Sequence, residues 1–213
     1  MVDANAWWNR LGAASGLVAF IAMVIGLGTT GFFDDGDIEP SDSAATIAHE
    51  LADQSELAPV ITVIGLLFFL WFLAYLRSHM RVTTDSWLTD VFFGGGLIYV
   101  AVMAGLIALQ LALATSSFSS DPQIAKTLFV VQWNYSLLFG PPVIAAAGAA
   151  AVLSIRFVAL PQWVGWVALV VALMGLLPWI GFIGLVLWSA IVSVTLLVQQ
   201  FQSAPDVHAA TPS

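Results

Sequence analysis

The sequence contains no cysteine, and only five of its 213 residues are lysine or arginine. The absence of cysteine excludes disulfide bonds, thiolate metal sites and thiol redox chemistry. Charged residues make up 8% of the chain and apolar residues 60%, whereas soluble domains have roughly 25% charged residues. The net charge of −8 argues against binding to nucleic acid. This composition predicts a polytopic integral membrane protein.

Long apolar runs make up most of the chain and define the predicted spans. Each span needs ~20 residues, so the chain has room for about six and for no separate soluble domain. The apolar sequence from 161 to 201 would form ~60 Å of helix, which is twice a bilayer core, and its Leu-Pro-Trp-Ile-Gly segment at 177–181 predicts a break. The sequence therefore predicts an all-α bundle of six transmembrane helices in one domain, residues 1–201, followed by a disordered cytoplasmic tail at 202–213. The predicted spans are residues 12–33, 59–76, 91–114, 123–155, 162–177 and 181–201.

Arginine placement predicts the topology of these spans. Arg10, Arg77, Arg81 and Arg156 lie between spans at ends that would face the same side. Positive residues favour the cytoplasmic side, so both termini are expected in the cytoplasm and the protein in the bacterial inner (cell) membrane. The first span is expected to be a retained signal anchor. Lys126 is the exception, at the outer end of the fourth span, where its stem can snorkel to the interface.

The outer loop at residues 34–58 carries many acidic residues and no lysine or arginine. Within it, residues 41–54 predict a short amphipathic helix whose apolar side, including Ile47 and Leu51, could lie on the membrane surface. Asp35, Asp37 and Glu39 have the spacing of calcium-loop ligands, but Pro40 stands where glycine is needed. His49 and Asp53 lack the further ligands of a zinc site. No metal site and no cofactor are predicted.

The most polar stretch inside a span is residues 132–136, followed by a Gly-Pro-Pro segment at 140–142 that predicts a kink. At 100° per residue, Gln132 and Ser136 share one face, whereas Asn134 lies about 160° from Ser136. Polar groups on opposite faces are costly in lipid. The fourth helix is therefore expected to be central, with neighbours on both sides.

These polar residues permit two interpretations. One is a ligand pocket in the outer half of the bundle, lined by Gln110, Lys126, Gln132, Asn134, Tyr135 and Ser136. The other is a set of interhelical hydrogen bonds that only hold the bundle together. No aspartate, glutamate, histidine, lysine or arginine lies deep in a predicted span, which argues against a proton or ion pathway and against an intramembrane enzyme, so no catalytic residue is predicted.

A small basic cluster follows the second predicted span. Arg77, His79 and Arg81 could hold an anionic lipid headgroup, although topology alone also accounts for the two arginines.

Four segments carry a resemblance to known sequences: Leu-Leu-Phe-Phe-Leu-Trp-Phe-Leu-Ala-Tyr-Leu-Arg at 66–77, Ser-Ala-Ala-x-Ile-Ala at 43–48, Leu-Pro-Gln-Trp-Val-Gly-Trp at 160–166 and Leu-Trp-x-x-x-Val-Ser at 187–193. Together they resemble a family of uncharacterised actinobacterial-type six-helix integral membrane proteins of unknown function. The resemblance covers nearly the whole chain, and it implies six helices and a bacterial inner membrane.

Two functions are expected from these observations. The first is a non-enzymatic membrane protein that binds membrane lipids, another apolar small molecule, a partner membrane subunit or further copies of itself. The alternative is a small transporter or permease that uses the neutral polar pocket. A water-accessible cavity running past Asn134 towards Gly140 would favour transport, whereas a dry core with a groove open to lipid would favour binding.

Overall fold

The structure is a computed structural model that describes residues 4–29, 39–51, 57–114 and 121–202. Every regular element in these ranges is a helix, which confirms the all-α class. The elements in order are α1 (Ala4–Gly28), α2 (Ala44–Leu51), α3 (Leu57–Thr83), α4 (Leu88–Ala114), α6 (Pro122–Tyr135), the 3₁₀ helix η1 (Ser136–Phe139), α7 (Gly140–Phe157), α8 (Gln162–Met174) and α9 (Pro178–Gln202). The predicted tail beyond Gln202 and much of the predicted acidic loop, including Asp35, Asp37 and Asp53, lie outside the described residues.

Within the described ranges, five helical stretches are long and apolar enough to cross a membrane. They are Trp7–Gly28, Leu57–Thr83, Leu88–Ala114, Pro122–Phe157 and Pro178–Gln202. The fifth predicted span corresponds to α8, which has only 13 residues and a length of ~20 Å against a bilayer core of ~30 Å. Whether this span crosses the bilayer stays a prediction.

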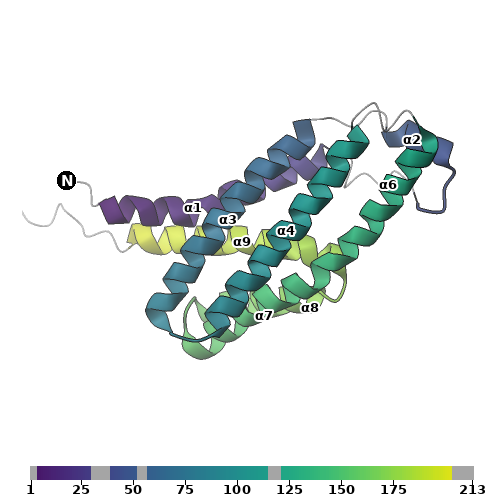
Figure 1. Ribbon diagram of the computed structural model, residues 1–213. Coiled ribbons are helices and arrows are strands. Elements are labelled where there is room, and N and C mark those ends of the chain that lie inside the picture. Colours follow the sequence, from purple (N-terminus) through teal and green to yellow (C-terminus); the bar gives the residue numbers. More distant parts are fainter. Residues whose placement is uncertain (1–3, 30–38, 52–56, 115–120, 203–213) are drawn as a thin grey trace, which may run out of the picture.

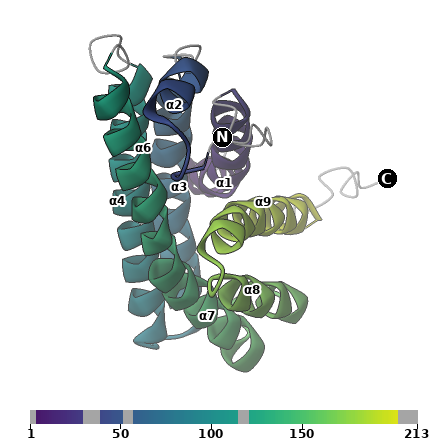
Figure 2. The same ribbon diagram turned by 90° about the vertical axis from the view of Figure 1, so that its right-hand side faces the viewer.

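The helices form a bundle in which α1 packs against α3 and α9, and α4 packs against α3, α6 and α7 (Figures 1 and 2). The N-terminal end of α1 lies beside the C-terminal ends of α3 and α9. There the Gln200 side-chain amide donates to the Asn9 carbonyl at 3.4 Å and to the Tyr75 hydroxyl at 3.0 Å. Arg10 lies 5.0 Å from the Phe201 ring centroid. The N-terminal and C-terminal ends of the described chain therefore lie next to each other, at the same end of the bundle.

Aromatic rings fill the middle of the bundle. Tyr99 is fully buried and its ring centroid lies 5.5 Å from those of Phe69 and Phe139 and 6.1 Å from that of Phe182. Phe139 and Phe182 are themselves 4.9 Å apart. These rings come from α3, α4, η1 and α9, so four segments share one apolar centre. Buried aromatic rings contribute large apolar areas to such a centre.

The fourth predicted span is broken into α6, η1 and α7, and the chain changes direction between α6 and α7 (Figure 1). Pro141 and Pro142 are the second and third residues of α7 and cannot donate backbone hydrogen bonds to the preceding turn. A short 3₁₀ turn absorbs this loss by changing the hydrogen-bond pattern. The kink therefore lies where the Gly-Pro-Pro segment predicts it.

The amphipathic helix of the outer loop is present as α2, but its predicted contact is wrong. Ile47 and Leu51 are buried in a small cluster with Leu113, against which Leu128 and Phe129 pack. The apolar side of α2 therefore covers α6 and the end of α4 and does not lie on the membrane surface. The sequence shows that this side is apolar but not what it faces.

Candidate functional site

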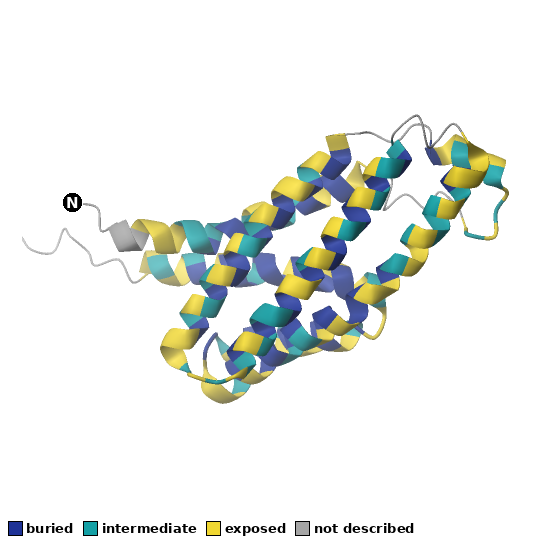
Figure 3. Ribbon diagram, viewed as in Figure 1, coloured by how far each residue is buried: buried dark blue, intermediate teal, exposed yellow. Residues whose placement is uncertain are grey.

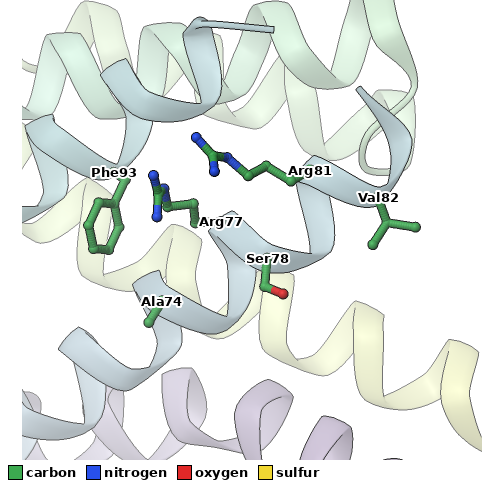
Figure 4. Close-up of a pocket in the computed structure, with 6 residues that line it drawn as sticks. All are labelled: Ala74, Arg77, Ser78, Arg81, Val82 and Phe93. Carbon is green, nitrogen blue, oxygen red and sulfur yellow. The ribbon is translucent and has the colours of Figure 1, made fainter. Parts of the chain in front are cut away.

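A groove of about 450 Å³ opens at the C-terminal end of α3 (Figure 4). Arg77 and Arg81 lie one helical turn apart on α3, so their side chains project from the same face. The groove is lined by Ala74, Arg77, Ser78, Arg81, Val82 and Phe93. It thus combines two guanidinium groups with apolar walls.

Both arginines bind the carboxylate of Asp90, which lies in the first turn of α4. Arg77 donates to Oδ1 from Nε at 3.2 Å and from Nη2 at 2.8 Å, and Arg81 donates from Nη2 to Oδ1 at 2.8 Å and to Oδ2 at 3.0 Å. The Arg77 guanidinium also lies 4.9 Å from the Phe93 ring centroid, a cation–π distance. One carboxylate and one ring thereby hold two cations in place, and one positive charge is left in excess.

Several donors of this cluster remain available to a ligand. An arginine has five N–H groups, and among the described residues Nη1 of Arg77 and both Nε and Nη1 of Arg81 have no hydrogen-bond partner. The side chains of Arg77, Arg81 and Asp90 are 35%, 47% and 54% exposed, so a ligand can reach them. Planar guanidinium donors match the geometry of phosphate and carboxylate oxygens.

His79, the third member of the predicted basic cluster, lies apart from the groove. Its ring stacks on Tyr75 with centroids 6.0 Å apart, on the side of α3 that faces α1 and α9. Sequence reasoning missed Asp90 and Phe93, which come from the next helix. The available signal was the short connection between Thr83 and Leu88, which brings the first turn of α4 beside the end of α3.

Four of the six predicted pocket residues face the interior of the bundle, in the half beside α2. Tyr135 packs on Gly105 where the antiparallel helices α6 and α4 cross. Gln110 lies ~8 Å from Gly105 along α4, towards the C-terminal end of that helix. Gln132 lies ~5 Å from Tyr135 along α6 in the same direction, so the two glutamines are at similar depth. Both have a buried side-chain oxygen with no hydrogen-bond partner in the described part of the chain. Ser136 is buried and donates to the Trp133 carbonyl at 2.6 Å.

The other two residues of the predicted pocket point elsewhere. Asn134 is exposed, and its amide donates to the Val130 carbonyl at 2.8 Å within α6. The Lys126 ammonium donates to the Asp42 carbonyl at 2.6 Å and ties α6 to the segment before α2. α6 has neighbours in α2 and α4, and Trp133 packs on Trp179 of α9 with ring centroids 5.8 Å apart. The expectation of neighbours on both sides is therefore wrong only at Asn134, whose side chain is exposed.

Over residues 4–29, 39–51, 57–114 and 121–202, no group of three or more histidine, aspartate or glutamate side chains could hold a metal ion. His49 lies on α2, while Asp53 lies outside the described residues. Within the described chain, the groove at Arg77 and Arg81 is therefore the place where charged side chains gather around an accessible volume.

Comparisons of the chain with protein-family models, with curated proteins and with solved structures give no match. The proposals for function accordingly rest on the geometry of the chain itself.

Proposed function

We propose that this chain is a non-enzymatic polytopic membrane protein that binds the phosphate of an anionic lipid headgroup in the groove at Arg77 and Arg81. The observation that carries this proposal is the excess of positive charge in an open groove: two guanidinium groups share the single carboxylate of Asp90. A phosphodiester carries one negative charge and would neutralise the remaining positive charge of the groove. Basic groups at the membrane surface attract anionic lipids by about 1 kcal/mol each.

The positions of the other basic residues support a cytoplasmic groove. Arg10 lies beside Phe201 at the end of the bundle where α3 terminates. Gly95 of α4 approaches Ala146 of α7, and since these helices are antiparallel, the end of α7 lies near the start of α4 (Figure 1). Arg156 is in the last turn of α7. Lys126 is at the other end, beside α2. This asymmetry follows the positive-inside rule for a bacterial inner-membrane protein with both termini in the cytoplasm.

The proposed topology has six passes, of which α8 is a short one. Trp163 and Trp166 near its start are more than half exposed and suit the cytoplasmic interface. A helix of 13 residues would end below the opposite surface. Because α8 and α9 form a hairpin, the C-terminal end of α9 returns to the cytoplasmic side whether or not α8 reaches the outer surface.

A lipid suits the groove better than a small soluble anion does. Ala74 and Phe93 extend the groove along α3 and α4 towards the apolar spans, where acyl chains would continue from a headgroup held at the arginines. Native mass spectrometry of the protein extracted from mixed-lipid membranes tests the proposal. The expected result is retention of anionic phospholipid over phosphatidylcholine, and equal retention of the two lipids would contradict it.

One observation favours the alternative function of a small transporter or permease. Gln110 and Gln132 place two buried oxygens, without a partner among the described residues, inside the outer half of the bundle, where a hydrogen-bond-donating solute could bind. The aromatic cluster around Tyr99 lies further along the same route and fills the centre. Solute uptake that is lost in Gln110→Leu, with the Arg77 and Arg81 groove intact, would support transport over lipid binding.

A further inference from the structure

One side of α6 packs against the protein, and the opposite side faces outward. Ala125 and Ser136 are buried on the packed side, which meets α4 and α2. At 100° per residue, Thr127 and Asn134 lie about 160° to 180° around the helix from these two residues, and both are exposed. Figure 3 shows exposed positions along the length of α6, and Figure 2 places α6 at the edge of the bundle.

Asn134 brings an unsatisfied amide to this outward face. It lies ~18 Å along the helix from Pro122, which is deep within a bilayer core of ~30 Å. One amide N–H donates to the Val130 carbonyl at 2.8 Å. The second N–H and Oδ1 have no partner among the described residues. Placing an amide without hydrogen-bond partners in hydrocarbon costs free energy. We therefore expect a partner outside the described chain to bind this face.

A second copy of this chain can satisfy Asn134 without any further polar residue. All copies insert in the same orientation, so when two α6 helices meet around a two-fold axis normal to the membrane, each residue meets itself at the same depth. An asparagine amide carries both a donor and an acceptor, and two facing amides form two reciprocal hydrogen bonds. A different partner would need its own polar group at the matching depth.

The surroundings of Asn134 suit such a contact. Val131 lies about 60° from Asn134 around the helix and is 46% exposed. Thr127 adds a small side chain whose hydroxyl already donates to the Gln123 carbonyl at 2.8 Å. The only charged residue of the segment 122–139 is Lys126, which bonds to Asp42 on another side of the helix. No like charges therefore oppose two copies of this face.

We infer that the outward face of α6 is the interface of a symmetric homodimer, centred on an Asn134 pair. This interface lies on a different helix from the arginine groove, at mid-depth in the bundle, and it does not depend on the proposed lipid binding.

The chain's lack of cysteine provides a direct test. Val131→Cys places a single thiol beside Asn134, and Ile64→Cys is the matched control because Ile64 is 47% exposed on α3 at a similar distance from the outer end of its helix. Oxidation in lipid vesicles at high dilution should cross-link Val131→Cys to twice the chain mass. Ile64→Cys should give at least tenfold less. Equal cross-linking of the two variants would overturn the inference, as would an adduct in native membranes with a protein of another mass.

The role of Asn134 itself is tested by Asn134→Leu in the Val131→Cys background. Loss of the reciprocal bonds should lower the dimerisation constant about tenfold, whereas Asn134→Gln should retain part of it. A Val131→Cys dimer unaffected by Asn134→Leu would overturn the Asn134-centred interface. Photobleaching of the fluorescently labelled, otherwise unchanged chain in bilayers tests the homodimer without any substitution, so the result does not depend on whether a variant folds. Two bleaching steps per particle are expected, and single steps at all lipid dilutions would contradict the homodimer.

Discussion

Arg81 binds both carboxylate oxygens of Asp90 through one nitrogen, Nη2, at 2.8 Å and 3.0 Å. This is not the fork-to-fork pairing in which an arginine spends two nitrogens on one carboxylate. Nε and Nη1 of Arg81 are therefore left to donate to another anion. Asp90 orients the arginine and still leaves it able to bind a ligand.

Removing the carboxylate should strengthen the binding of anions. In Asp90→Asn the groove gains one net positive charge, and at roughly 1 kcal/mol per charge near a membrane surface the affinity for anionic lipid should rise about fivefold. Titration of phosphatidylglycerol vesicles at two salt concentrations measures the change, and the gain should shrink at high salt. Asp85→Asn is the control, because Asp85 is exposed in the same connection but forms no ion pair with the described residues. An equal gain in both variants would mean that net charge, not this groove, sets the affinity.

Lys126 should hold α2 on the bundle. Lys126→Met removes the 2.6 Å bond to the Asp42 carbonyl and should destabilise the docked state of α2 by about 1.5 to 3 kcal/mol. Hydrogen exchange over residues 44–51 should then become at least tenfold faster, while exchange in α9 stays the same. Lys126→Arg can still donate and serves as the control. Unchanged exchange in Lys126→Met would show that Ile47 and Leu51 suffice to hold α2.

The crossing of α4 and α6 should depend on Gly105. A Cβ atom there would overlap the Tyr135 hydroxyl, so Gly105→Val should cost about 1 to 3 kcal/mol of stability and lower Tm. A Cβ atom added at Gly94 would meet nothing within 4 Å, so Gly94→Ala should leave Tm nearly unchanged. Thermal unfolding in detergent compares the two variants. Equal Tm values would contradict the close α4–α6 contact.

Substitution of Gln110, the buried glutamine of α4, distinguishes a structural role of its amide from a role in ligand binding. Gln110 is only 4% exposed and its Oε1 has no partner in the described chain, so Gln110→Leu should maintain or raise Tm. A loss of about 1 to 2 kcal/mol would show instead that the amide links two helices. Unchanged Tm with lost solute uptake would favour the transporter alternative.

Much of the helical framework could be predicted from the sequence, because apolar runs and the residues that interrupt them determine where helices begin and end. The Gly-Pro-Pro segment marks the break before α7, and the polar connection after Arg81 marks the end of α3. The sequence places the end of the fifth span at residue 177, whereas α8 ends at Met174. Its end at Met174 coincides with a place where Gly175 comes close to Gly140 and Gly181, and this depends on how three distant segments pack.

The candidate site could be predicted only in part. The spacing of Arg77 and Arg81 shows that they share a face of α3, but the presence of Asp90 and Phe93 beside them depends on the angle between α3 and α4. His79 is close to the arginines in sequence, yet it projects from another side of the helix and stacks on Tyr75. For α6, the periodicity places Asn134 opposite Ser136 correctly, but it cannot say which face has a neighbour.

The most direct test of the central claim is a lipid-binding titration of Arg77→Gln/Arg81→Gln beside a matched double variant, Arg10→Gln/Arg156→Gln. Both remove two positive charges from the same end of the bundle, but only the first removes them from the groove. In nanodiscs, or by native mass spectrometry, the first variant should lose at least tenfold in affinity for phosphatidylglycerol, and the second should lose much less. Equal losses, or no loss in the first variant, would contradict an anionic headgroup site at Arg77 and Arg81.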